Sequence, residues 1–513
     1  MTQQTLAGPS SGRSNNSRGG NTAGAGTEAP PFSSIDDIVS AIRSTPANSN
    51  DVQTVLLPSL LKTFHSQKGK GQKIFRKPLQ DGVDPLGMLD PAINTLGYTF
   101  ILGVRSAQCT TQEEARAFMP VIAAFAGSFD SQQWIGAGDA VTTLVRGIVN
   151  VARISEDLVW ANPSLLRIMD AFRRVQGGLN NLTVIHVVVL YHLLQTAHYE
   201  TAMDWILQYD LVSADTKVTP LVYSDVLEYF YYGGMICTKV GDLEKGATLF
   251  QQCVATPAQA VSAIQIDAYK KLILIQLMKD GTVSRMPTFT SQAVTRAIRG
   301  NLSNLEAYHS FIKVYTNEVS LKIAASHEQE TKKSSKRNLV QNLQEFVQQK
   351  QEIFERDQNF GLVQSLVEVY LSRRVARLSK LFAIISIGEI VKLLHIEEDL
   401  GVPLEQACKQ IFEALQRAQQ MQWIKASYKG ETVSSSASVV VQFEQSHVDV
   451  ANGPETSLRL MNVMKEGQHW SKILQEKERS LAQSEAYLAK VINPSRSGFG
   501  TLSMDDFDED VYV

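Results

Sequence analysis

Residues 230–257 read FYYGGMICTKVGDLEKGATLFQQCVATP. Two runs of helix-forming composition flank the dipeptide Gly241-Asp242, which favours a turn. Gly234 and Gly246 lie one in each run, where a missing side chain lets two helices approach closely. Aromatic residues of the same runs would fill the groove between the helices. The stretch therefore predicts two packed antiparallel helices joined by a tight turn.

The spacing of this hairpin is typical of tetratricopeptide-type repeats, and Pro257 closes the unit. The same helical period extends on both sides of it. Val141, Leu144 and Ile148, for example, recur at the spacing of one helix face. Strand-like alternation is scarce in this part of the chain. We therefore expect residues 32–371 to form an all-α helical-repeat solenoid in which each hairpin packs on its neighbours.

Three polar segments are expected to lie outside the repeats. Residues 1–31 are rich in Ser, Gly, Asn and Thr, so they cannot bury enough apolar surface to offset the entropy of ordering and are expected to be disordered. Residues 65–86 and 326–338 are expected to be solvated surface loops. The first also carries five basic residues, which leaves a nuclear-import or phosphate-contacting patch as an alternative. Order is expected to begin at Ser34, with Asp37 completing a capping box.

Composition and charge exclude several classes of protein. The chain is 44% hydrophobic and 20% charged, as soluble globular proteins are, and its formal net charge is −3. A dedicated nucleic-acid binder would be clearly basic, because neutralising phosphates supplies much of its affinity. The N-terminal residues do not have the pattern of a signal peptide, and no apolar run approaches the ~20 residues that cross a bilayer. We expect a cytoplasmic and nuclear protein that binds neither membranes nor nucleic acid.

The chain has four cysteines, at positions 109, 237, 253 and 408. None forms a C-x-x-C pair or stands in a tight cluster with histidine. That spacing argues against a disulfide framework and against a structural zinc site. Reduced, buried thiols in an intracellular protein are expected instead.

Motifs of catalysis are missing from the sequence. It contains no G-x-x-x-x-G-K-[ST] loop, no G-x-S-x-G elbow, no H-E-x-x-H helix and no H-x-H pair. His186, His192 and His198 are spaced six apart, whereas two ligands on one helical face need a spacing of three or four. We predict no catalytic residue, no metal site and no cofactor, and expect these histidines to be packed or surface residues.

The pattern changes after about residue 372. Residues 377–385 are expected to form a short helix, Ser386 to cap a second, and Pro403 to open a third. A turn-rich linker then leads to the β-branched run at 439–443. Three short helices followed by a two-stranded β-hairpin are typical of a winged-helix module, expected over residues 372–445.

The third of these helices tests whether the module reads nucleic acid. It carries Lys409 and Arg417, but also Glu405 and Glu413. A DNA-reading helix would show an excess of basic and amide side chains. Contacts with protein through an exposed strand of the hairpin fit better, because such a strand can pair with another chain. A winged-helix nucleic-acid binder remains an alternative.

A long helix is expected over residues 455–492, which would span roughly 55 Å. An apolar stripe of that length exceeds what the small module before it can cover, so the helix is expected to join partners in a bundle. The alternative is a helix laid along the solenoid of the same chain. Residues 493–513 form an acidic tail with interleaved aromatics, expected to be disordered and a possible contact for a basic partner. The stripe comprises Leu460, Val463, Trp470, Leu474, Leu481 and Leu488.

A helical-repeat array that runs into a winged helix is the layout of the PCI domain, which occurs in the proteasome lid, the COP9 signalosome and translation initiation factor 3. Four ungapped stretches resemble the signalosome members of this family over roughly residues 220–390. They are YYGGMI at 231–236, TPAQAVSAI at 256–264, YKKLIL at 269–274 and FERDQNFGLV at 354–363, with TSQ at 290–292 between them.

The resemblance implies a non-catalytic scaffold. The signalosome removes the ubiquitin-like protein NEDD8 from cullins and so regulates cullin–RING ubiquitin ligases, and its zinc-dependent isopeptidase is a different subunit. PCI subunits contribute winged helices to an open ring and C-terminal helices to a central bundle. Carried onto this sequence, ring contacts would involve Val439, Val441 and Phe443, and bundle contacts the apolar stripe of residues 455–492. A subunit of the proteasome lid or of initiation factor 3 is the nearest alternative.

Overall fold

The computed structural model describes residues 31–47, 50–66, 70–175, 180–209, 211, 213–300, 305–316, 339–397, 401–421, 423–429, 437–443, 454–484 and 488. The disordered segments expected at 1–31 and 493–513, and the loop expected at 326–338, lie essentially outside these residues. The described chain divides into two compact units. The first ends at Arg373, and the second comprises most of the chain from Arg374 onward.

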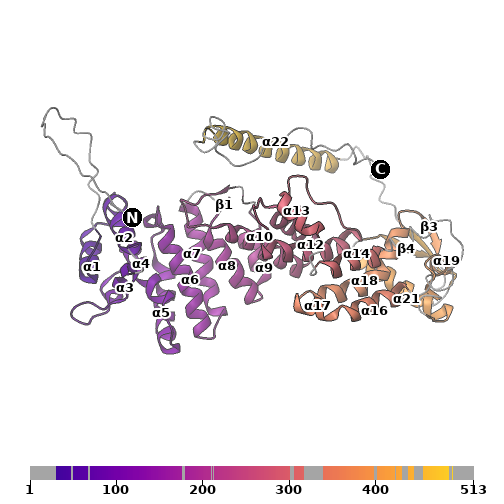
Figure 1. Cartoon of the computed structure of the whole chain (residues 1–513), viewed down its shortest axis with the longest axis horizontal. Coiled ribbons are helices and arrows are strands. Elements are labelled where there is room, and N and C mark those ends of the chain that lie inside the picture. The colour runs from indigo at the N-terminus through magenta and orange to yellow at the C-terminus, as the bar shows by residue number, and fades with distance from the viewer. Residues whose placement is uncertain are drawn as a thin grey trace, which may run out of the picture. The chain divides into compact units, whose positions relative to one another are not determined.

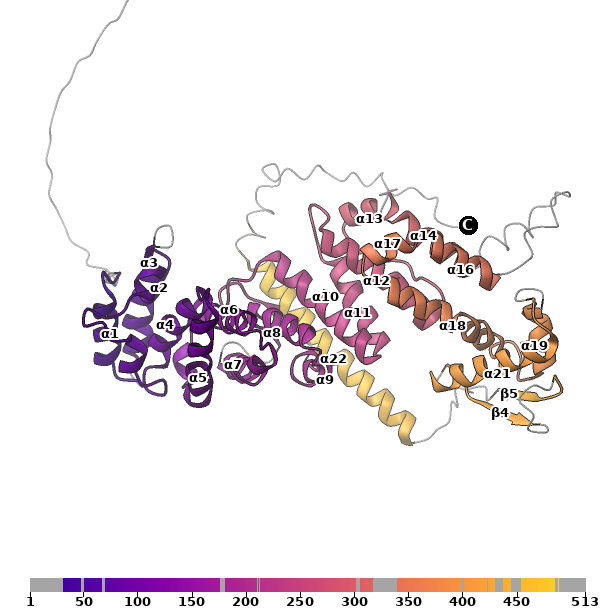
Figure 2. The ribbon, with the colours of Figure 1, turned by 90° about the horizontal axis from the view of Figure 1, so that it is seen from below.

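The first unit is an array of helices that follow one another in sequence order (Figures 1 and 2). Its longer helices pack against their neighbours in the chain, which is the arrangement of a helical-repeat solenoid. Its elements are α1 (Ile35–Ser44), η1 (Val52–Leu56), α2 (Leu57–Phe64), α3 (Lys70–Arg76), η3 (Pro85–Met88), α4 (Thr95–Ala107), α5 (Gln112–Ser128), η4 (Ser131–Trp134), α6 (Gly138–Ile154), η5 (Val159–Ala161), α7 (Asn162–Val175), α8 (Val184–Gln195), α9 (Tyr199–Ala202), η6 (Met203–Leu207), α10 (Tyr223–Val240), α11 (Leu243–Ala255), α12 (Ala263–Asp280), α13 (Gln292–Arg299), α14 (Glu306–Thr316), α16 (Leu339–Gln349), α17 (Gln351–Arg356) and α18 (Phe360–Leu378). A short parallel pair of strands, β1 (Asn181–Leu182) and β2 (Ser213–Ala214), lies among them.

The first helix begins where its capping signal predicts. The Ser34 side chain accepts a hydrogen bond from the Asp37 backbone N–H, and the Asp37 carboxylate accepts one from the Ser34 backbone N–H. These two bonds satisfy donors that the first helical turn leaves unpaired. The four apolar residues of α1 that face inward are buried, so the expected start of the ordered array is confirmed: Ile35, Ile38, Val39 and Ile42.

The α10–α11 hairpin confirms the role expected of its glycines. A Cβ atom on Gly234 would come within 2.8 Å of the Phe250 ring, and one on Gly246 within 3.0 Å of Thr238 Oγ1. Gly241 ends α10 with a φ of 97°, a left-handed conformation that favours glycine. The two helices therefore touch at positions where a side chain larger than hydrogen would push them apart.

The basic segment at 65–86 differs from its expectation. Residues 70–76 form α3, so this part is a helix and not a loop. Phe75 is fully buried and stacks on Phe100 of α4, with ring centroids 5.8 Å apart. An apolar anchor within a polar run therefore holds the segment against the repeats, and the sequence pattern did not reveal it.

The described part of the second unit that precedes its long final helix contains a three-stranded antiparallel sheet and two helices. Its elements are β3 (Ile384–Ser386), α19 (Ile387–Leu393), α21 (Leu404–Gln420), β4 (Ala426–Lys429) and β5 (Val440–Phe443). The strand order is β3-β5-β4, so the last strand in sequence lies in the centre. This succession of helices and strands is that of a winged-helix module.

Two details of this module depart from the sequence expectation. The helix expected over 377–385 is wrong, because α18 ends at Leu378 and residues 384–386 form β3. The two-stranded hairpin is consequently a three-stranded sheet. The helix boundaries agree better: Ser386 caps α19 in a capping box with Glu389, and Pro403 precedes α21.

A final long helix, α22, extends from Pro454 to Ala482. The helix expected over 455–492 is therefore present as far as Ala482, and Gln483 and Ser484 follow it in non-helical conformation. Residues 485–487 and 489–492 of the expected helix lie outside the described residues. Among the residues that the structure describes, none of the helices combines the length and apolarity that crossing a bilayer requires.

Candidate protein interaction surfaces

The apolar stripe of α22 is exposed along its length. The side chains of Leu460, Val463, Leu474 and Leu481 each keep 62–64% of their surface accessible, and Trp470 keeps 40%. Leu488 lies beyond the end of the helix and is 44% accessible. By contrast, the apolar residues of α1, α6 and α12 are mostly buried in the first unit. The structure thus places five of the six predicted bundle residues on one helix and leaves them uncovered.

Spacing along α22 puts these residues on one side of the helix. Leu460, Val463, Trp470, Leu474 and Leu481 follow one another at intervals of three, four or seven residues. Gly467 falls in the same series, and no atom outside its own helix backbone lies within 4 Å of the position its Cβ would occupy. A seam with this period is the kind that packs against another helix.

The predicted contact strand of the winged-helix module needs a correction. Val439, Val441 and Phe443 are 7%, 0% and 3% accessible, and β5 is paired on both sides. The expectation that this strand forms an exposed edge is therefore wrong. β3, whose residues lie 54–58 positions before their partners in β5, takes the position beside it, so β5 is not an edge strand.

The free edges of this sheet belong to β3 and β4. Ile384 of β3 is 60% accessible, and Leu381 just before the strand is 74% accessible. On β4, the Ala426 carbonyl already accepts a hydrogen bond of 3.0 Å from Gln419 Nε2. The apolar and more open edge is therefore β3, which the sequence reading had assigned to a helix.

The exposed face of α21 is of mixed charge. Glu405, Lys409, Glu413 and Arg417 are all exposed. Two cations alternate with two anions along this face, which gives no net attraction for phosphates. The electrostatics of the helix thus favour protein contacts over nucleic-acid contacts.

Of the three histidines spaced six apart, His186 and His192 are core residues and His198 is half-buried. His186 is 2% accessible and His192 is fully buried. Burial, with a smaller contribution from Arg173, lowers the pKa of His186 to about 4, so this side chain is neutral at physiological pH. Within the described part of the chain, no three His, Cys, Asp or Glu side chains gather in a way that could hold a metal ion. All four cysteines are buried, as expected.

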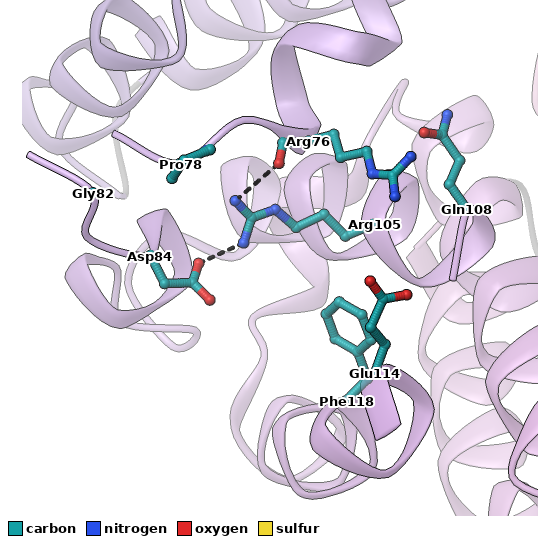
Figure 3. Close-up of a pocket in the computed structure, with 8 residues that line it drawn as sticks. All are labelled: Arg76, Pro78, Gly82, Asp84, Arg105, Gln108, Glu114 and Phe118. Atoms are coloured by element: carbon teal, nitrogen blue, oxygen red, sulfur yellow. Dashed lines mark hydrogen bonds and ion pairs between the residues drawn. The ribbon is translucent and has the colours of Figure 1, made fainter. Parts of the chain in front are cut away.

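A pocket near α3 is lined by an arginine, Arg105, whose contacts are structural. Arg105 lies in its wall, as Figure 3 shows, with its guanidinium directed at Asp84 and at the Arg76 carbonyl. Nη1 lies 2.5 Å from Asp84 Oδ1, while Nε and Nη2 donate to the carbonyls of Phe75 and Lys77 at 3.2 and 3.0 Å. The donors of this cation are therefore used to hold the C-terminal end of α3.

The sequence reading missed a buried ionic cluster in the first unit. The Lys270 ammonium lies 2.9 Å from Asp357 Oδ2 and 3.3 Å from Asp267 Oδ1. The side chains of Lys270 and Asp357 are only 4% and 9% accessible, whereas that of Asp267 is 53% accessible. Tyr308 donates a hydrogen bond of 3.1 Å to the same Asp357 oxygen.

A second lysine completes this cluster. Lys271 Nζ donates to Asn359 Oδ1 at 2.6 Å, and Asn359 Nδ2 donates to Tyr308 Oη at 2.8 Å. Burial lowers the pKa of the Lys271 ammonium, and Nζ lies 5.9 Å from the centre of the Tyr231 ring. The cluster joins α10, α12, α14 and the connection between α17 and α18.

These contacts involve three of the stretches that carry the family resemblance. Tyr231 belongs to the first stretch, Lys270 and Lys271 to the third, and Asp357 and Asn359 to the fourth. Segments up to 128 positions apart in the sequence thus meet at one buried site. Three of the stretches therefore supply residues to one buried cluster of this chain, and nothing in their spacing indicated that they touch.

Comparisons with known proteins agree with this resemblance. A family model described as COP9 signalosome complex subunit 3, N-terminal helical repeats, matches residues 61–294. The COP9 signalosome complex subunit 3 of Arabidopsis thaliana is 26% identical over 365 residues, which cover 70% of this chain and 76% of that protein. The subunit of the same name from Drosophila melanogaster is 29% identical over 170 residues, 33% of each chain. The resemblance predicted from residues 220–390 is confirmed, and it extends towards the N-terminus.

Proposed function

We propose that this chain, a relative of COP9 signalosome complex subunit 3, is a non-catalytic scaffold subunit of the COP9 signalosome. The observation that carries the proposal is the uncovered apolar face of α22. An exposed apolar stripe of this length is typical of a surface that binds another protein, because leaving apolar surface in water is unfavourable. A scaffold subunit needs such a surface, whereas an enzyme needs a reactive cleft.

Helices of other PCI subunits are the proposed partners of α22. Leu460, Val463, Trp470, Leu474 and Leu481 would enter a shared helical bundle, with Leu488 continuing the contact beyond the helix. Fully burying one large apolar side chain contributes about 1.5–3 kcal/mol. Five or six such side chains supply enough to hold a subunit in a complex even after the cost of association is subtracted.

The winged-helix module is proposed to supply a second contact. With β5 in the centre of the sheet, the strand that would pair with a neighbouring subunit is β3, through Ile384 and the adjacent Leu381. In this arrangement Val439, Val441 and Phe443 would contribute indirectly, by forming the buried layer that holds β3 in position. This assignment replaces a direct contact through β5.

In this proposal the chain supports deneddylation without performing it. The complex would remove NEDD8 from cullins through a zinc-dependent isopeptidase in another subunit, and cullin–RING ligases would meet this chain only indirectly. It would act in cytoplasm and nucleus, without a cofactor.

The test is a gentle affinity purification from cells followed by mass spectrometry of the partners. Recovery of several PCI subunits with an isopeptidase that acts on neddylated cullins is expected. Recovery of proteasome-lid or initiation-factor components would contradict the signalosome assignment and point to the neighbouring PCI complexes. Steeply salt-dependent retention of nucleic acid would favour the winged-helix nucleic-acid binder instead.

The bundle contact can be tested with a matched pair of variants. Leu474→Asp with Leu481→Asp places two charges in the proposed seam and is expected to abolish co-purification, because buried unpaired carboxylates are strongly unfavourable. The control, Gln475→Asp with Ala482→Asp, moves the same two charges by one residue, off the apolar face. Equal recovery of partners by both variants would refute the role of this face.

A further inference from the structure

The segment between α12 and α14 is basic and carries no carboxylate side chain. Between Asp280 and Glu306 the sequence has three arginines and no other charged residue, although the formal net charge of the chain is −3. Arg285 lies in the loop before α13, and Arg296 and Arg299 lie in the last turn of that helix. All three are exposed. The segment is therefore a local concentration of positive charge in a chain that is slightly acidic overall.

The α13 helix directs two of these arginines outward. Val294 and Ile298, one turn apart, are buried in the core of the first unit. Arg296 lies midway between them in the sequence, which places it on the opposite side of the helix. Gln292 lies one turn before it and Arg299 one turn after it. The three form a polar stripe that extends over roughly 10 Å along the helix.

An exposed aromatic side chain lies at the N-terminal end of the same helix. Phe289 is 74% accessible and precedes the first helical residue, Gln292, by three positions. The backbone around it is held in place, because the Thr290 N–H donates to the Pro287 carbonyl at 3.0 Å and the Ser291 side chain caps α13. An apolar contact is thus available beside the arginines.

The arginines of this segment have no anionic partner within the described residues. Arg296 Nη2 donates to a neutral amide oxygen of its own helix at 3.4 Å. Neither Arg285 nor Arg299 takes part in an ion pair among the residues that the structure describes. By contrast, Lys279 at the end of α12 pairs with Glu244. Guanidinium groups form their strongest hydrogen bonds with carboxylates, so these three are available to an acidic ligand.

We propose that a basic surface formed by Arg285, Phe289, Arg296 and Arg299 binds a short acidic segment of a partner protein, in which an apolar side chain accompanies at least two carboxylates. The proposed function uses only surfaces of the second unit, so this contact goes beyond it. In an extended peptide, alternate residues point to the same side about 7 Å apart, a spacing that flexible arginine side chains can match. The apolar side chain would pack on the phenylalanine ring.

The limits of the basic surface favour a short peptide over a nucleic acid. In the sequence the basic run ends at Asp280 on one side and at Glu306 on the other, and both side chains are exposed. A nucleic acid carries a phosphate at every nucleotide, so it would continue past the arginines towards these carboxylates and into the field of an acidic chain. A peptide can place its few carboxylates at the arginines alone.

Fluorescence anisotropy of a labelled peptide tests the proposal. The probe is a synthetic octapeptide with one phenylalanine followed by four glutamates, titrated with the full-length chain, and saturable binding is expected. Arg296→Glu with Arg299→Glu should weaken binding by at least about tenfold, because repulsion replaces attraction. The matched control, Lys73→Glu with Lys77→Glu, makes the same change in net charge at exposed lysines on and next to α3. It should change the affinity by less than about twofold at physiological ionic strength, where screening confines exposed charges to short range.

Two single variants separate the apolar contact from the ionic one. Phe289→Ala should weaken binding by about fivefold and leave its salt dependence unchanged, whereas Phe289→Leu should retain most of the affinity. Arg285→Glu should weaken binding and reduce its salt dependence. Because Arg285 lies outside α13, this variant gives the same answer even if charge reversal within the helix lowers its stability. Both side chains are exposed, so the urea midpoint of each variant should match that of the wild type.

Three results would overturn the proposal. They are no saturable binding of the peptide, equal weakening by the α13 pair and the α3 pair, and tighter binding of a labelled oligothymidylate than of the peptide, which would identify nucleic acid as the ligand. The isolated chain is measured, so the outcome does not depend on PCI subunits. A chain that binds the peptide but recovers no such subunits would support the basic surface and contradict the scaffold function, and the converse result would do the opposite.

Discussion

Removing Asp357 should expose how strongly the first unit depends on its buried ionic cluster. In Asp357→Ala, the Lys270 ammonium would stay in a site where its side chain is 4% accessible and would lose a carboxylate 2.9 Å away. The Tyr308 hydroxyl would also lose its acceptor at 3.1 Å. Breaking a buried ion pair from one side usually costs about 3–5 kcal/mol, because an uncompensated charge remains. We expect about 3 kcal/mol here, at the lower end of that range, since Asp267 still lies 3.3 Å from the ammonium.

Native-state hydrogen exchange is the suitable assay. The chain contains two compact units, so a single unfolding transition for the whole molecule is not assumed, whereas amide exchange reports the opening free energy of α12 and α18 individually. Asp267→Ala is the matched control. It removes a carboxylate from the same lysine, but one that is 53% accessible, and should cost less than about 1 kcal/mol. Equal losses in the two variants, or a loss below about 1 kcal/mol for Asp357→Ala, would refute the reasoning that Asp357 is the main ion-pair partner of the buried Lys270 side chain.

Two further perturbations test the packing of the repeats. Gly234→Ala would place a Cβ within 2.8 Å of Phe250 and should destabilise the first unit by about 1–3 kcal/mol in urea unfolding, despite the better helix propensity of alanine. The control is Gly127→Ala, whose Cβ would meet no atom within 4 Å, and it should be neutral or slightly stabilising. An equal effect of both substitutions would contradict the close contact at Gly234. Acidification should destabilise the first unit through His186, because its pKa is about 4 in the folded chain and about 6.5 when unfolded. Its stabilising contribution is complete above pH 6.5 and is lost as pH falls towards 4, up to about 3 kcal/mol. Urea midpoints at pH 7 and pH 4.5 check this, and a pH dependence unchanged in His186→Gln would count against it.

The features predicted well from the sequence depend on neighbours in the chain. The capping boxes of Ser34 and Ser386, the left-handed turn at Gly241 and the contact at Gly234 all involve residues within about sixteen positions of one another. A capping side chain bonds to a backbone group three residues away, so its signal is readable without knowing the rest of the fold. The same is true of the apolar stripe on α22, whose period sets which side chains share a face.

The errors all involve partners that are distant in the sequence. Residues 384–386 are apolar and short enough to suit either helix or strand, and they become β3 because Val441 is available to pair with Ile385. That pairing places β5 in the centre of the sheet and removes it from the surface. The α3 helix similarly depends on Phe75 meeting Phe100 of another helix. Long-range pairing of this kind overrides local propensity.

Sequence alone determined that this chain is a helical-repeat protein with a winged-helix module and a helix bearing a one-sided apolar stripe, because periodicity, caps and turns are local properties of the chain. Only the tertiary structure decided which surfaces are available. It buried Val439, Val441 and Phe443, brought Lys270 and Asp357 together across 87 positions, and left the stripe of α22 exposed. The exposure of a side chain depends on which segments pack over it. Those segments can be far apart in the sequence, and their separation in sequence does not show that they will be in contact.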